Sequence, residues 1–121
     1  VIPTIEQYKP ELIVIASGLD ANAVDPLARQ LLHGGTFREM TALVKELADR
    51  ICDGRVVAVH EGGYAESEVP FCGLAIVETL SGIRTEVVDP FEEVFVAQQP
   101  TQRVVDFQCS LIDEMAQALS L

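Results

Sequence analysis

Tryptophan is absent from this chain of 121 residues, and no apolar run in it is long. The longest wholly apolar stretch, residues 12–16, is far shorter than the roughly 20 residues that a membrane-spanning helix needs. Val1 does not open a basic and then apolar signal segment. Three cysteines without C-x-x-C spacing argue against a disulfide framework or a zinc ribbon. We therefore expect a cytoplasmic protein that has no membrane partner.

Basic residues are also scarce, and this limits the partners of the chain. Eight Lys and Arg residues stand against 19 Asp and Glu residues, for a formal net charge of -11. Beyond residue 60 only Arg84 and Arg103 are basic. Because phosphate-backbone binding needs a basic face, nucleic acid is not an expected partner. The acidic excess is either a solvated surface or a face that attracts cationic amines, and composition leaves both open.

Two short apolar segments are the predicted strands. Residues 12–16 and 56–59 are continuously apolar and rich in β-branched side chains, which is typical of strands buried on both faces of a parallel sheet. Helices are predicted over residues 1–9, 36–53, 70–80 and 102–119. Residues 19–35 are predicted to be a loop with at most a helical turn, and the stretch around Pro90 and Pro100 to be irregular.

Local signals define where two of these helices begin. Thr36 and Glu39 satisfy a capping box, so the second helix is expected to start there. Pro70 suits the first position of the third helix. That helix is apolar nearly all round, and we therefore expect it to be buried.

The order helix, strand, helix, strand, helix indicates an α/β fold with a right-handed crossover between two parallel strands. Only two strands are predicted, and each needs neighbours to bond its ladder. We therefore expect residues 1–121 to be the carboxyl-terminal portion of a single larger domain, incomplete without the rest.

Candidate functional residues follow the two predicted strands. Ligands of open α/β sheets bind beyond the carboxyl ends of the strands, where this chain carries Asp20 and the segment 60–64. A carboxylate there could bind a metal, and a tyrosine after two glycines could donate its hydroxyl to a substrate. In the alternative, Asp20 caps a helical turn and Tyr64 only packs. Spacing alone does not decide between them.

Five sequence blocks together resemble one known family. They are PELIVIASGLDA at 10–21, DPLAR at 25–29, DGRVV at 53–57, HEGGY at 60–64 and VPFCGLA at 69–75. In order and spacing they resemble the end of zinc-dependent histone deacetylases, and most closely the bacterial class II histone deacetylase-like amidohydrolases. The resemblance covers residues 1–85.

The resemblance implies an arginase-like α/β fold and zinc-dependent hydrolysis of N-acyl amides of lysine or polyamines, N-acetyl amides foremost. It makes Asp20 the last of three protein ligands of the zinc ion. It makes Tyr64 the donor of a hydroxyl to the substrate carbonyl and its oxyanion. It places Leu27 on the channel for the aliphatic arm of the substrate, with Gly62 and Gly63 in the channel wall.

The sequence departs from this family in one decisive respect, besides a lesser departure at Ala65, where many relatives carry asparagine or serine. The paired catalytic histidines and the Asp-x-His zinc ligands precede these blocks in the family, and no such segments occur here. We interpret His33 and His60 as loop and sheet-end residues that do not replace them. Glu61 is interpreted as a hydrogen-bonded neighbour of the site, and the three cysteines as core residues.

The expected partners are an acylated amine substrate and the amino-terminal part of the same domain, and a homo-oligomer is left open. The rival interpretation is a truncated, non-catalytic module that binds a partner chain or small ligand through its exposed sheet edge. A nucleotide-binding fragment is disfavoured, because no predicted strand leads into G-x-G-x-x-G or a phosphate-loop lysine.

Overall fold

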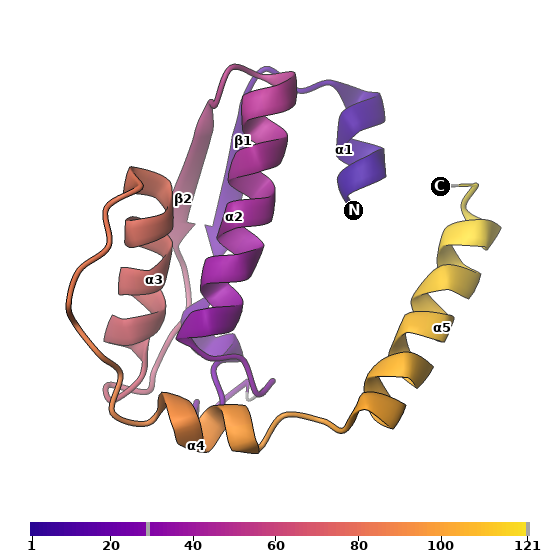
Figure 1. The fold of residues 1–121 in the computed structure, drawn as a ribbon. Helices are drawn as coiled ribbons and strands as arrows, with labels where there is room; N and C mark the ends of the chain where they lie inside the picture. The colour runs from indigo at the N-terminus through magenta and orange to yellow at the C-terminus, as the bar shows by residue number, and fades with distance from the viewer. Residues whose placement is uncertain (29, 121) are drawn as a thin grey trace.

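The computed structural model describes residues 1–28 and 30–120 as a small parallel sheet with flanking helices (Figure 1). The predicted order of helices and strands is confirmed, with one further helix before the last. The elements are α1 (Ile2–Tyr8), β1 (Ile13–Ser17), the 3-10 helix η1 (Leu19–Ala21), α2 (Gly34–Ile51), β2 (Val56–His60), α3 (Val69–Ser81), α4 (Glu92–Ala97) and α5 (Gln102–Ala118).

Strands β1 and β2 pair in parallel, as the βαβ pattern predicts. Ile13 lies opposite Val56, and Ser17 lies opposite His60. Helix α2 makes the crossover between them. Because the strands are parallel and in this register, the chain leaves both of them at the same end of the sheet.

The core lies between one face of this sheet and the helices α2 and α3. In a first cluster, Ile13 of β1 packs with Leu47 and Ala48 of α2. In a second cluster, Phe37 of α2 packs with Cys72 and Ile76 of α3. Full burial of a side chain such as Leu47 contributes about 1.5 to 3 kcal/mol to stability.

The opposite face of the sheet is open in this chain. Val14 is 60% exposed, Val57 47% and Val59 45%. Within residues 1–28 and 30–120, the expectation that both strands are buried on two faces is therefore wrong. Side chains alternate between the faces of a strand, and the helices of this chain cover one face only.

The capping box predicted at Thr36 is also wrong, because α2 begins two residues earlier, at Gly34. The cap is His33, whose Nδ1 accepts a hydrogen bond from the backbone N–H of Gly35 at 3.2 Å. This imidazole nitrogen pairs with one of the free N–H groups of the first turn. The sequence predicts that capping role for the hydroxyl of Thr36.

Helix α3 begins close to the predicted Pro70 and ends at Gly82, whose φ of 73° is a left-handed conformation that suits glycine. Its buried side chains include Cys72 and Ile76, but Val77 is 61% exposed. The expectation of burial on all sides is therefore wrong on the face that carries Val77.

After α3 the chain is held by one buried carboxylate. Glu78 accepts hydrogen bonds from the backbone N–H of Thr85 at 2.7 Å and lies 2.7 Å from the Arg38 guanidinium. The hydroxyl and N–H of Thr85, together with Arg38, hold the pKa of Glu78 at about 2, well below its ordinary value. This cluster ties the segment after α3 to α2.

Helices α4 and α5 run along the edge of the molecule and away from the sheet (Figure 1). Helix α4 falls in the stretch expected to be irregular, and it buries Phe95. Helix α5 has the predicted start but contains no buried residue, and its Cys109 is exposed, so the expectation that all three cysteines are core residues is wrong there. Within residues 1–28 and 30–120, no helix combines the length and apolar character needed to cross a membrane.

Candidate active site

The segments that follow β1 and β2 are joined by backbone hydrogen bonds. The N–H of Glu61 donates to the carbonyl of Ser17 at 3.0 Å, and the N–H of Leu19 donates to the carbonyl of Gly62 at 2.7 Å. These bonds continue the parallel pairing past the strand ends. They bring the segment that carries Asp20 against the glycine-rich loop, as the sequence predicts.

The two glycines of this loop allow the chain to pass close to Asp20. A Cβ atom on Gly62 would lie 2.7 Å from Oδ2 of Asp20, which is shorter than real contacts allow. Gly63 has a φ of 143°, where other residues are strained, and a Cβ there would lie 3.0 Å from Leu19. Gly63 is thus required by its backbone conformation, and Gly62 leaves room for the Asp20 carboxylate in the position that it occupies.

The Asp20 carboxylate is half-buried and takes part in none of the hydrogen bonds found between described residues. The residue before η1 is Gly18, and no side chain caps this helix. The interpretation of Asp20 as a helix cap is therefore not supported. The carboxylate remains available to a ligand.

Residues 1–28 and 30–120 do not form a complete metal site by themselves. No three His, Cys, Asp or Glu side chains among residues 1–28 and 30–120 gather where they could hold a metal ion. A catalytic zinc ion takes three protein ligands. The described residues could therefore supply part of such a site at most, and Asp20 is the candidate among them.

Tyr64 and Leu27 both expose their side chains. Tyr64 is 56% exposed and Leu27 is 73% exposed, so neither is a core residue. The backbone N–H of Tyr64 donates to Oδ2 of Asp25 at 2.9 Å, and the N–H of Leu27 donates to Oδ1 of Asp25 at 2.8 Å. The sequence places Asp25 in the DPLAR block, within a predicted loop, and does not predict this link between the two loops.

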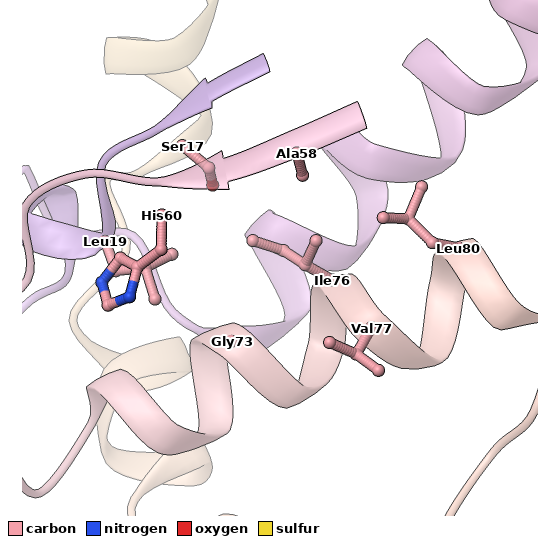
Figure 2. Close-up of a pocket in the computed structure, with 8 residues that line it drawn as sticks. All are labelled: Ser17, Leu19, Ala58, His60, Gly73, Ile76, Val77 and Leu80. Atoms are coloured by element: carbon pink, nitrogen blue, oxygen red, sulfur yellow. The ribbon is translucent and has the colours of Figure 1, made fainter. Parts of the chain in front are cut away.

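A separate hollow lies between the sheet and α3 (Figure 2). Its walls are mostly apolar, and His60 is their one titratable side chain. The lining residues are Ser17, Leu19, Ala58, His60, Gly73, Ile76, Val77 and Leu80. Asp20, Leu27 and Tyr64 do not line it, so this hollow is distinct from the predicted site.

Just after the Tyr64 loop, a buried acid begins helix α3. Glu68 has no exposed surface, and its Oε2 has no hydrogen-bond partner among the described residues. Burial, followed by the negative charges of Asp89 and Glu92, raises the pKa of Glu68 to about 7, although the Cys72 thiol opposes this by donating to it. The folded protein thus holds this proton more tightly than the unfolded chain does.

Replacing Glu68 by glutamine should therefore reduce the loss of stability that the protein shows as the pH rises. The folded-state pKa lies above the ordinary value of 4.5, so stability is lost as the pH rises from about 4.5 through about 7, by about 3 kcal/mol in all. At pH 8 the variant should melt at a higher temperature than the parent, and at pH 5 the two should be similar. Thermal unfolding at both pH values measures this.

The control for this prediction is Glu66→Gln, which removes an exposed carboxylate two residues away. This control should keep the pH dependence of the parent. If Glu68→Gln also keeps it, the buried acid is already ionised in the folded state at neutral pH.

Comparison with known proteins decides the family of the chain. Residues 1–80 match the model of the histone deacetylase domain. The chain belongs to the histone deacetylase family. The match ends inside α3, so α4 and α5 lie outside it.

Members of the histone deacetylase family match this chain in sequence to different extents. It is 53% identical over all 121 residues to a histone deacetylase-like amidohydrolase of Pseudomonas aeruginosa, of which it covers 32%. It is 36% identical over 81 residues to a probable deacetylase of Archaeoglobus fulgidus, covering 66% of this chain and 23% of the relative. The chain thus spans a third or less of the length of these relatives.

Solved structures confirm the deacetylase fold. The histone deacetylase Clr3 superposes with a TM-score of 0.60 and 26% identity, covering 79% of this chain and 16% of Clr3. The HD domain of HDA15 superposes with a TM-score of 0.59 and 25% identity, covering 71% and 23%. The small parallel sheet with flanking helices is therefore part of an arginase/deacetylase-like α/β fold.

Proposed function

We propose that this chain is the carboxyl-terminal part of a zinc-dependent amidohydrolase that removes acyl groups, acetyl foremost, from the amines of lysine or polyamines. The observation that carries this proposal is the contact between Asp20 and Gly62 at the carboxyl end of the parallel pair. This contact places the Asp20 carboxylate against the loop that carries the exposed Tyr64. The chain that holds both residues belongs to the histone deacetylase family.

In this proposal Asp20 supplies one of three zinc ligands, and the other two come from the part of the domain that this chain lacks. A zinc ion, when bound, polarises the amide carbonyl and lowers the pKa of water toward neutrality. A carboxylate oxygen is one of the ligand types that zinc accepts, and the half-buried Asp20 side chain supplies it at the strand end.

Tyr64 acts on the substrate in this proposal. Its hydroxyl donates a hydrogen bond to the substrate carbonyl and stabilises the oxyanion that forms when water attacks. Its exposed side chain is free to meet a substrate that enters from solvent. Leu27 lines the channel for the aliphatic arm, Gly62 and Gly63 form the wall beside it, and the acidic surface attracts a cationic amine.

A second function is favoured by the open face of the sheet. Val14, Val57 and Val59 form an exposed apolar surface, and a module that only binds a partner chain would use such a surface. The two functions differ in what this surface contacts. The enzyme covers it with the rest of its own domain, whereas the module covers it with another protein.

The purified 121-residue chain should bind zinc weakly and should not hydrolyse an acetyl-lysine peptide, because it offers one carboxylate for a three-ligand site. Co-expression with the amino-terminal part of the domain should give a complex with one zinc ion and measurable turnover. Zinc content and product formation are measured on both samples.

The control is the same complex carrying Asp53→Asn, an exposed carboxylate remote from the site, which should keep both zinc and turnover. Turnover by the isolated chain that a chelator abolishes would contradict the proposal. So would a well-formed complex without zinc or activity, which would favour the binding module.

A further inference from the structure

Asp25 is one of the few charged residues buried in this molecule. It has no exposed surface, and it lies in the loop between η1 and α2. Its Oδ1 accepts hydrogen bonds from the N–H groups of Leu27 at 2.8 Å and Ala28 at 3.2 Å. This is the local turn that aspartate commonly forms with the residues that follow it.

The second oxygen of the same carboxylate reaches a distant part of the chain. Oδ2 accepts a hydrogen bond from the backbone N–H of Tyr64, 39 residues further on, at 2.9 Å. One buried side chain therefore holds both the turn that carries Leu27 and the backbone from which Tyr64 projects.

We propose that Asp25 is a positioning residue that sets the Tyr64 hydroxyl relative to the substrate channel at Leu27. This inference rests on the proposed function. The Tyr64 side chain is largely exposed, so its direction depends on its backbone, and Asp25 is the side chain that bonds this backbone N–H. The bonds from Glu61 and Leu19 fix only the start of the loop.

The charge of Asp25 suits this role. Burial by itself would raise the pKa of the carboxyl, but the backbone N–H groups of Leu27, Tyr64, Ala28 and Ala65 outweigh it and hold the pKa below the ordinary value. A carboxylate can accept bonds on both oxygens, whereas an asparagine of the same shape can accept on one only. Asp25→Asn therefore breaks one arm of the link and keeps the size of the side chain.

The test is a double-mutant cycle in the complete domain, with Asp25→Asn and Tyr64→Phe made singly and together. Asp25→Asn should lower kcat at least tenfold while leaving the zinc content unchanged. In the Tyr64→Phe background it should lower kcat by less than threefold, because the hydroxyl that Asp25 positions is already gone. A residue that acts only through general stability would give the same loss of kcat in both backgrounds.

The matched control is Glu78→Gln, another buried carboxylate that accepts a backbone N–H but lies on α3 away from the loop. It should lower the melting temperature and leave kcat within twofold. Equal effects of Asp25→Asn in both backgrounds, or none in either, would overturn the inference. Absence of zinc-dependent turnover in the parent would instead overturn the proposed function.

A measurement on the parent protein keeps the inference testable if Asp25→Asn does not fold. The amide of Tyr64 should exchange with deuterium at least tenfold more slowly than that of Glu66 in the same loop, because Asp25 holds the Tyr64 N–H. Equally fast exchange at the two amides would show that the bond is not maintained in solution and would overturn the inference.

Discussion

Tyr64→Phe in the complete domain should lower kcat by about 100- to 1000-fold, which corresponds to about 3 to 4 kcal/mol of lost transition-state stabilisation. Phenylalanine keeps the ring and removes the hydroxyl that donates to the developing oxyanion. Because this bond strengthens in the transition state, KM should change little. Zinc content should stay at the parental level. Steady-state kinetics and metal analysis measure all three quantities.

Tyr8→Phe is the control for this prediction. Tyr8 is 81% exposed at the end of α1, far along the chain from the loop, and its loss of a hydroxyl should leave kcat unchanged. A Tyr64→Phe variant with near-parental kcat would remove Tyr64 from the catalytic residues. Its exposed side chain would then need another explanation.

Asp20→Asn should weaken zinc binding. It should lower the catalytic rate only because less zinc is bound. The substitution replaces a charged ligand by a neutral one and should reduce zinc affinity by more than about 100-fold. Removing a group that only orients a metal ligand already costs up to about 100-fold, and loss of the ligand itself should cost more. Activity at low free zinc should be lost, and part of it should return when zinc is added in excess. Zinc titration followed by activity measures this dependence.

The contrast with Tyr64→Phe makes the two roles separable. Excess zinc should restore activity to Asp20→Asn in part and should not help Tyr64→Phe at all. If Asp20→Asn keeps full zinc occupancy and activity, Asp20 is not a ligand, and the contact with Gly62 serves only the fold.

The parallel pairing and the meeting of the two segments that follow the strands could be predicted because both depend on local patterns. Two β-branched runs separated by an amphipathic helix leave few alternatives to a right-handed crossover. Once the strands are parallel, residues that follow them must meet at one end, and Asp20 and Gly62 do so. Gly62 suits the same geometry, because a Cβ there would displace the Asp20 carboxylate from its position.

What could not be predicted depends on contacts between distant residues. The bond from Tyr64 to Asp25 spans 39 residues, and an Asp-Pro pair in a sequence indicates only a turn. The cap of α2 was missed because histidine is an uncommon cap, whereas Thr36 with Glu39 matches a frequent motif. The raised pKa of Glu68 likewise depends on its burial and on the charge of Asp89, which an irregular segment brings to it.

The open face of the sheet links folding to assembly. Val14, Val57 and Val59 are exposed here, so a polypeptide segment that covered them would add the free energy of burying their side chains to the stability of the fold. A partner that binds the folded state alone raises its stability as the concentration of the partner rises. In the enzyme that we propose, with its two parts supplied as separate chains, the folding of these residues and the formation of the active site would be one equilibrium, governed by the concentration of the other part.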